Sequence, residues 1–452
     1  MRKMTVSDFV KSEMIQYSAY DNYRSIPYIM DGLKVSQRKA VFFFLEKAKD
    51  EKIKVAQAAA STSFHTHYQH GEDSLAGTIA GMAQSFPGTN NVPILEAHGQ
   101  FGSRLNKQTA AYRYIFTKPS IHMKRLFIKD DIEITQRQYS EGGEFGDRIE
   151  PFCYYPLIPL WILNGTEGIG SGHASNILPR KLENVVKLVK LLVKGNNPTQ
   201  KTIDTLLTPH FNDWKGVVVP VEDGCVSWEL SGTFERKNTT TLVVNELPIG
   251  VDDIKYKTTL IDLLDSKDIS DYDNDSSEES FKYTVVSTRE WMKQSDASLM
   301  RKLKLVKRVT ENVTLWSPEG KLKRYDNVYD ALCAFVNARL EVYTVRKEHL
   351  LRKYNEELLY TENKIRFLNY WNTKLKNTHN KPLDEVKAEL VDKGGVSVKY
   401  INNFMSISVS SLTKTSVDEL KNKMDVLSKT IDDLTRKTEI DLYTTDLNEI
   451  CK

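Results

Sequence analysis

A stretch rich in arginine and lysine carries the clearest chemistry in this sequence. Between Phe101 and Lys129 the chain has seven basic residues and no acidic residue. The seven are Arg104, Lys107, Arg113, Lys118, Lys124, Arg125 and Lys129. Such a stretch attracts a polyanion, for example the phosphate backbone of a nucleic acid. A solvated surface that binds nothing is the alternative for any run of charge.

Acidic residues gather further along the chain. The segment from Asp262 to Glu279 holds eight acidic residues and one lysine, so a polyanion would be repelled there. Its run Asp271–Asp275 does not fit a calcium-binding EF-hand. Such a loop needs glycine and glutamate where this chain has Ser276 and Lys282. We expect a solvated acidic loop.

Two other patterns argue against common kinds of site. The glycine-rich segment Gly168–Gly172 lacks the lysine of a P-loop, and no strand–helix unit of the dinucleotide-binding type surrounds it. The cysteines have no CxxC spacing, so they predict neither a disulfide framework nor a zinc cluster. They are Cys153, Cys225, Cys333 and Cys451. Nothing indicates haem or iron–sulfur chemistry.

Length and composition describe a globular, multidomain chain. The 452 residues suggest about three domains. Hydrophobic residues make up 40% and charged residues 27%, and the net charge of +3 does not by itself point to a nucleic acid. No apolar run approaches the roughly 18 residues of a membrane span, and the segment Met1–Thr5 does not lead into the apolar core of a signal peptide. We expect a cytoplasmic protein that is not secreted.

The pattern of elements changes twice along the chain. Residues 1–150 predict short helices, two of which in succession resemble a helix-turn-helix. Residues 151–325 predict a helix over about Lys181–Val193 and several strands. The expected helices of the first part lie at about Thr5–Tyr20, from Ser36, over Lys54–Ala60 and from Glu72; the expected strands are Gly216–Val221, Thr240–Val244, Phe281–Val286 and Val313–Trp316. The fold class is therefore α+β, multidomain.

The last part, 326–452, has two runs with apolar residues spaced by three and four. They extend from Leu351 to Leu368 and from Val417 to Leu434, on either side of an insert at about 373–415. Matched runs of this kind predict an antiparallel coiled-coil arm with a small helical head. Two ordinary bundle helices are the alternative.

Five motifs together resemble one family, the DNA breakage-reunion core of the type IIA DNA topoisomerases. They are Asn22-Tyr-Arg-Ser-Ile-Pro-Tyr-Ile-Met-Asp-Gly-Leu-Lys-Val-Ser-Gln-Arg38, Tyr68-Gln-His-Gly-Glu72, Gly99-Gln-Phe-Gly-Ser-Arg104, Ala110-Ala-Tyr-Arg-Tyr-Ile-Phe-Thr-Lys118 and Glu167-Gly-Ile-Gly-Ser-Gly172. The resemblance covers essentially the whole chain. It implies a winged-helix domain at 1–150, a tower domain at 151–325, and an arm at 326–452 whose head forms a C-gate.

The residues in these motifs resemble those of the eukaryotic and T-even phage enzymes more than those of gyrase. Met1 stands almost directly before the winged-helix region, whereas the family's ATPase and Toprim domains precede it. We therefore expect the DNA-cleaving subunit of a split-gene enzyme, most like the phage medium subunit, in a bacterial or phage-infected cell. Mg²⁺ would then be held mainly by a partner Toprim subunit, while ATP would be bound by that partner and not by this chain.

The resemblance implies catalytic roles for four residues. Tyr114 matches the nucleophile that forms a 5′-phosphotyrosine intermediate, and Arg113 matches the neighbouring arginine. Arg24 matches a further arginine brought to the scissile phosphate, and His70 matches a supporting histidine. An ordinary phenol, with a pKa of about 10, is mostly protonated at neutral pH and needs such help. For each residue a purely structural role is the alternative.

Other residues are predicted to contact DNA. Lys34, Gln37 and Arg38 surround the start of the second helix, where the family approaches the backbone; a solvated cap is the alternative. The resemblance also implies that Ile169 wedges between base pairs, with a buried turn as the alternative. The basic residues expected to add affinity are Arg104, Lys107, Lys118 and Lys124.

One tyrosine cuts one strand, so a double-strand break requires two copies of the chain. We expect a homodimer joined through the heads, acting on double-stranded DNA and passing a second duplex through the break. A non-catalytic architectural protein, with a winged helix for DNA and a coiled coil for dimerisation, is the competing class. Covalent trapping on DNA distinguishes the two.

Overall fold

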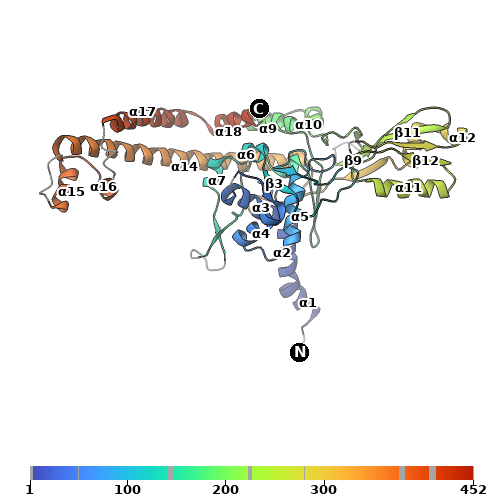
Figure 1. Ribbon diagram of the computed structural model, residues 1–452, viewed down its shortest axis with the longest axis horizontal. Coiled ribbons are helices and arrows are strands. Elements are labelled where there is room, and N and C mark those ends of the chain that lie inside the picture. Colours follow the sequence, from blue (N-terminus) through green and yellow to red (C-terminus); the bar gives the residue numbers. More distant parts are fainter. Residues whose placement is uncertain are drawn as a thin grey trace. The chain divides into compact units, whose positions relative to one another are not determined.

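The computed structural model describes residues 4–48, 50–140, 146–221, 226–278, 280–375, 382–406 and 414–450. The chain divides into two compact units. One consists of Met1–Leu340 with Tyr443–Lys452, and the other of Glu341–Leu442 (Figure 1). Cys225, Cys451 and parts of the predicted head lie outside the described residues.

The larger unit begins with short helices, as predicted. In chain order they are α1 (Val6–Phe9), η1 (Val10–Met14), α2 (Ile15–Ser25), α3 (Val35–Phe42), η2 (Phe43–Lys47), α4 (Val55–Thr66) and α5 (Glu72–Ala83). Thr5 caps the first of them, because its hydroxyl accepts the backbone N–H of Asp8 at 3.1 Å. Helix α2 ends later than the predicted Tyr20. The indole of Trp316 donates to the carbonyl of Asn22 at 3.2 Å and holds this last turn.

A three-stranded antiparallel sheet lies among these helices in the sequence. Its strands are β1 (Ile53–Lys54), β3 (Phe116–Pro119) and β2 (Leu95–His98), in the order β1-β3-β2. Strand β3 pairs with both neighbours, so it is the fixed centre of the sheet. The apolar residues that the helices bury here include Val41, Leu75 and Ile79, each 0% exposed. Figure 1 shows α3, α4, α5 and β3 gathered in this part of the unit.

The chain then forms short elements that lead to a hairpin. These are α6 (Ile121–Leu126), α7 (Lys129–Glu133), β4 (Gln138–Tyr139), β5 (Arg148–Ile149) and α8 (Leu160–Leu163), followed by β6 (Thr166–Ile169) and β7 (Ala174–Ile177). The two strands of the hairpin pair antiparallel from Thr166–Ile177 to Ile169–Ala174, which puts Ile169 beside the turn.

The following segment confirms the predicted mixture of helices and strands. The helices are α9 (Leu182–Val193), α10 (Gln200–Leu206), α11 (Asp253–Asp265), α12 (Arg289–Met292) and α13 (Asp296–Lys302). The strands are β8 (Val217–Pro220), β9 (Ser227–Ser231), β10 (Thr233–Arg236), β11 (Thr241–Glu246), β12 (Asp271–Asn274), β13 (Tyr283–Val286), β14 (Val306–Thr310), β15 (Val313–Trp316) and β16 (Leu322–Tyr325). They form sheets in the orders β10-β11-β13-β12, β14-β9-β8 and β15-β16, so the fold is α+β.

The prediction of an acidic loop at Asp271–Asp275 was wrong. Residues Asp271–Asn274 form β12, which pairs antiparallel with β13 at the edge of the four-stranded sheet. The aspartate side chains stay exposed, and Asp275 forms an ion pair with Lys282 at 2.9 Å. The backbone of β12 therefore bonds to β13 on one side, while the charged side chains remain in water, which is how edge strands are commonly kept soluble.

The smaller unit contains the paired helices that the sequence predicted. The elements are α14 (Val328–Tyr370), η4 (Trp371–Leu375), α15 (Leu383–Asp392), α16 (Val398–Met405), α17 (Lys414–Arg436) and α18 (Glu439–Glu449), of which α14 and α18 begin in one unit and end in the other. Lys423 forms an ion pair with Glu357 at 2.6 Å. Val417, which is earlier in α17, packs instead with Leu368, which is later in α14. The two helices therefore run antiparallel.

Helices α15 and α16 form a small helical head at the end of this pair. Their buried residues Val386, Leu390 and Phe404 pack with Phe367 of α14 in one apolar cluster.

The division of the chain at residues 150 and 325 stays a prediction. Within the part of the chain that the structure describes, no helix combines the length and the apolar character needed to cross a membrane.

Candidate functional site

Tyr114 lies in a turn that the start of α4 holds in place. The backbone N–H of Val55 donates to the carbonyl of Ile115 at 3.0 Å, and that of Ala56 donates to the carbonyl of Tyr112 at 3.2 Å. First-turn N–H groups have no partner within their own helix, so they are free to bind this turn. Ile115 is buried at 1% exposure, whereas the Tyr114 side chain is 70% exposed. The turn is anchored, and it presents the phenol to solvent.

The other two residues of the Tyr-Arg-Tyr motif, Tyr112 and Arg113, differ in their exposure to solvent. Arg113 is exposed, and its guanidinium carbon lies 5.6 Å from the centre of the Tyr114 ring, within the range of a cation–π contact. Tyr112 is half-buried and faces α5, because its hydroxyl would lie 3.3 Å from a Cβ placed on Gly77. Tyr114 is therefore the accessible tyrosine of the pair.

Arg24 and His70 line one open cavity of about 600 Å³. Arg24 is exposed in the last turn of α2 and makes no hydrogen bond or ion pair with the described residues. His70 lies in the connection between α4 and α5, and its Nε2 is 3.2 Å from the hydroxyl of Tyr20. Tyr114 and Arg113 are not among the residues that line this cavity.

The structure thus brings Arg24 and His70 together and leaves the Arg113–Tyr114 pair on its own turn. Gln69 also lines the cavity. Sequence reasoning did not identify Tyr20, which belongs to none of the five motifs.

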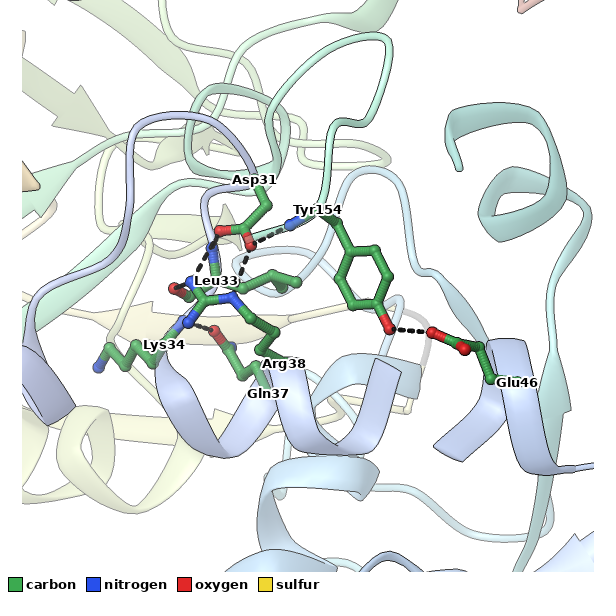
Figure 2. A network of polar contacts seen from close by, with 7 residues as sticks. All are labelled: Asp31, Leu33, Lys34, Gln37, Arg38, Glu46 and Tyr154. Atoms are coloured by element: carbon green, nitrogen blue, oxygen red, sulfur yellow. Dashed lines mark hydrogen bonds and ion pairs between the residues drawn. The ribbon is translucent and has the colours of Figure 1, made fainter. Parts of the chain in front are cut away.

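Arg38 is buried, which argues against the prediction that it contacts DNA. Its Nε and Nη2 donate to the carboxylate of Asp31 at 2.7 and 3.0 Å, and Nη2 also donates to the carbonyl of Leu33 at 3.0 Å (Figure 2). The side chain is 4% exposed. Burial alone would lower the pKa of Arg38, but the adjacent Asp31 outweighs it and raises that pKa. With Nε, Nη2 and its charge used internally, Arg38 holds the start of α3.

Asp31 is the centre of this network. Besides Arg38, its carboxylate accepts the backbone N–H groups of Leu33 at 2.9 Å and Tyr154 at 3.1 Å. The hydroxyl of Tyr154 in turn donates to Glu46 at 3.2 Å, as Figure 2 shows. The network ties the segment before α3 to the chain beyond residue 150.

Lys34 and Gln37 form the cap of α3. The backbone N–H of Lys34 donates to Oε1 of Gln37 at 2.9 Å, which satisfies the N-cap position. The Lys34 ammonium donates to the carbonyl of Glu167 at 2.6 Å, and burial lowers the pKa of Lys34 while the charge of Glu167 opposes that shift. Both side chains are half-buried, so their contact with DNA stays a prediction.

Arg104 also has an internal role, which argues against its predicted contact with DNA. Its Nη2 donates to the carbonyls of Leu247 at 2.9 Å and Pro248 at 3.0 Å, and it lies 3.6 Å from the carboxylate of Glu246. The residue is 7% exposed. A guanidinium held in this way fastens the basic segment to the region after β11 and cannot reach a phosphate on the surface.

The remaining predicted lysines are nearer to solvent. Lys118 lies 3.3 Å from Glu96, and Lys124 forms an exposed ion pair with Asp50. Burial lowers the pKa of Lys107, an effect that Asp252 opposes. Exposed pairs of this kind exchange readily with other anions. The DNA contacts predicted for these lysines remain predictions.

A second cavity, of about 580 Å³, joins Lys107 with Lys307 and Arg308 of β14. Sequence reasoning missed the two β14 residues, because they are about 200 residues away from the basic stretch. The adjacent pair Lys307-Arg308 in a strand was the feature of the sequence that could have indicated a second cationic site. Only the fold brings the three cations to one cavity.

Ile169 is exposed, which argues against the alternative of a buried turn. Its side chain is 76% exposed at the end of β6. A β-branched residue favours a strand, and here it is carried on the outside of the hairpin. Its insertion between base pairs stays a prediction.

Among the residues that the structure describes, no group of three or more His, Cys, Asp or Glu side chains lies close enough together to hold a metal ion.

Comparison with known proteins identifies close similarities. A family model that describes the A-type subunit of DNA gyrase/topoisomerase IV matches residues 24–448. DNA topoisomerase 2-beta of Homo sapiens is 31% identical to this chain. The match covers 99% of this chain and 29% of the human protein. DNA topoisomerase 2 of Arabidopsis thaliana is 35% identical over 81% of the chain and 25% of that protein.

A solved structure is similar over nearly the whole chain. It is the crystal structure of the Plasmodium falciparum topoisomerase II DNA-binding, cleavage and re-ligation domain, with a TM-score of 0.88 and 31% identity. The match covers 98% of this chain and 63% of that one. The chain spans less than a third of the length of the two curated relatives.

Proposed function

Since the chain belongs to the family of the A-type subunits of DNA gyrase/topoisomerase IV, we propose that it is the DNA-cleaving part of an ATP-dependent type IIA DNA topoisomerase. The observation that carries this proposal is the exposed Tyr114 beside Arg113, on a turn anchored by α4. A nucleophile must be accessible to a large substrate and yet held in a defined position. This turn meets both requirements.

The proposed reaction is a transesterification. The Tyr114 oxygen attacks a DNA phosphorus, so an oxygen–phosphorus bond forms to the tyrosine and the bond to the 3′-oxygen breaks. The phenol loses its proton, and the 3′-oxygen gains one. One phosphodiester replaces another, so cleavage requires no nucleotide, and the reverse step reseals the strand.

The neighbouring cations have distinct proposed roles. Arg113 stays beside the phenol and would neutralise charge on the phosphate. Arg24 has an exposed guanidinium without a partner among the described residues, so it can bind a phosphate oxygen without first breaking an ion pair. His70, hydrogen-bonded to Tyr20, would hold the phosphate or assist proton transfer. A duplex lying across both surfaces would contact all of these groups.

Ile169 is the proposed wedge that bends the DNA. We expect Ile169→Ala to reduce bending and to slow cleavage by about tenfold, because alanine cannot fill an opened base step. The melting temperature should not change, since the side chain is largely exposed. Fluorescence transfer across a doubly labelled duplex measures the bend. Unchanged bending together with a lower melting temperature would show that Ile169 serves the fold instead.

Two copies of the chain are proposed to act together, one on each strand. Large apolar side chains on the head support its use as a dimer contact: Leu383 is 55% exposed and Val398 is 71% exposed. They are the first residues of α15 and α16.

We propose that the domain division 1–150, 151–325 and 326–452 corresponds to winged helix, tower and arm.

The partner is proposed to be a separate Toprim/ATPase subunit, as for the phage medium subunit, within the cytoplasm. It would hold Mg²⁺ and bind ATP. An exposed apolar face on the first helices supports a protein contact there. Its members are Val6, Phe9, Val10, Met14, Ile15 and Tyr17, which are 45% to 80% exposed.

Reconstitution tests the proposed function. The chain alone should bind DNA weakly, with strong salt dependence, and should trap little covalent adduct. Addition of a Toprim/ATPase subunit should give Mg²⁺-dependent adducts in denaturant, and ATP should then permit strand passage. The same mixture without Mg²⁺ is the control.

Two results would count against this assignment. Efficient Mg²⁺-dependent relaxation by the chain alone would contradict the separate partner. Tight DNA binding without any covalent adduct, even with the partner and Mg²⁺, would favour the architectural alternative.

A Phe9→Glu, Ile15→Glu variant should lose partner binding but retain DNA binding, because both residues lie on the exposed apolar face.

A further inference from the structure

The hairpin β6–β7 rests on the last turns of α2. The amide Nδ2 of Asn22 donates to the carbonyl of Ser171 at 3.0 Å. The hydroxyl of Ser171 donates to the carboxylate of Asp21 at 2.8 Å. Two consecutive residues of α2 therefore hold the turn that follows Ile169.

The contact between hairpin and helix is unusually close. A Cβ on Gly170 would lie 2.2 Å from Oδ1 of Asn22, and a Cβ on Gly168 would lie 2.3 Å from the carbonyl oxygen of Ser25. Neither glycine has a positive φ. Space, and not backbone conformation, thus requires glycine on both sides of Ile169.

One atom of the Asn22 side-chain amide has no hydrogen bond to the described residues. The residue is 7% exposed, and its Oδ1 is buried without a hydrogen-bond partner among the described residues. A buried polar atom without a partner is unfavourable, so its presence calls for an explanation. Its backbone carbonyl, by contrast, is already held by Trp316 at 3.2 Å.

We propose that Asn22 is a positioning residue, whose amide fixes the hairpin so that Ile169 meets the duplex at a set place relative to Arg24. Arg24 is two residues further along the same helix. The wedge and the phosphate-binding arginine are thereby carried on one rigid support. This inference rests on the proposed function, because it concerns bending and cleavage of DNA.

Asn22→Ala is the direct test. It removes the hydrogen bond to Ser171 and leaves the contact of the backbone carbonyl at position 22 with Trp316. We expect cleavage in the reconstituted enzyme to slow by about tenfold, the size of effect that one lost hydrogen bond can have on a rate. Bending by fluorescence transfer should fall in parallel, while DNA affinity and its salt dependence should stay the same.

Rescue distinguishes positioning from a general loss of stability. A duplex with an abasic site at the wedge position is already flexible, so it should restore cleavage by Asn22→Ala. The same duplex should not rescue Arg24→Ala, whose proposed contact is with the phosphate. A variant that is merely unstable would gain nothing from flexible DNA.

A second variant approaches the contact from the hairpin. Gly170→Ala places a methyl group against Asn22 and should give the same defect and the same rescue. Gly81→Ala is the matched control, because a Cβ there meets nothing within 4 Å. Asp21→Asn keeps an oxygen that can accept from Ser171, and should behave nearly as the wild type.

The outcomes separate the two proposals. A wild-type enzyme that forms no covalent adduct with its partner overturns the proposed function, and this inference with it. A wild type that bends and cleaves, with Asn22→Ala and Gly170→Ala equal to it, overturns this inference alone. Loss of melting temperature without rescue by abasic DNA also overturns it.

Discussion

Tyr114→Phe should abolish covalent trapping on DNA while leaving DNA binding nearly unchanged. The substitution removes the one oxygen that the proposed reaction needs, and the ring keeps its contact with the Arg113 guanidinium. The anchoring of the turn is through backbone groups of Val55 and Ala56, so it should persist. The measurement is the amount of protein–DNA adduct in denaturant, with partner and Mg²⁺ present. We expect a loss of at least about 10⁴-fold, because no other group supplies the nucleophile.

Tyr112→Phe is the matched control. Tyr112 is two residues away, but it faces α5 and is half-buried, so its loss should leave cleavage within a fewfold of the wild type. Adducts formed by Tyr114→Phe would contradict the assignment of the nucleophile. Adducts lost only in Tyr112→Phe would move that assignment to the other tyrosine.

Asp31→Ala should strongly destabilise the larger unit. The Arg38 guanidinium would remain buried without its counter-charge, and the N–H groups of Leu33 and Tyr154 would lose their acceptor. Breaking a buried pair in this way lowers the free energy of unfolding by about 3–5 kcal/mol. Urea unfolding followed by tryptophan fluorescence measures the loss, and Trp161 is a buried reporter beside Leu160, whose N–H donates to the Asp31 carbonyl.

Asp50→Ala is the comparison for this prediction. It removes the exposed partner of Lys124, where both side chains are more than half exposed, so stability should scarcely change. If Asp31→Ala were equally mild, Arg38 would not be held in a buried pair. Its contact with DNA would then have to be reconsidered.

Local pattern was sufficient for elements whose character is decided within a few turns. The alternation of apolar residues predicted α9 and the antiparallel pair of α14 and α17, because a helix buries one face at regular spacing. It failed for Asp271–Asn274, where composition indicated a loop. Pairing with β13 decided that segment, and such pairing depends on residues outside it.

The sequence by itself determined the family resemblance, the α+β class and the Arg113–Tyr114 pair, since each depends on residue types at fixed spacing along the chain. Only the tertiary structure decided which cations are available. Arg38 and Arg104 look like phosphate ligands in sequence, yet both are buried: Arg38 against Asp31 and the carbonyl of Leu33, and Arg104 against carbonyls that follow β11. Burial and charge pairing are properties of the space around a side chain, and folding alone brings those neighbours together.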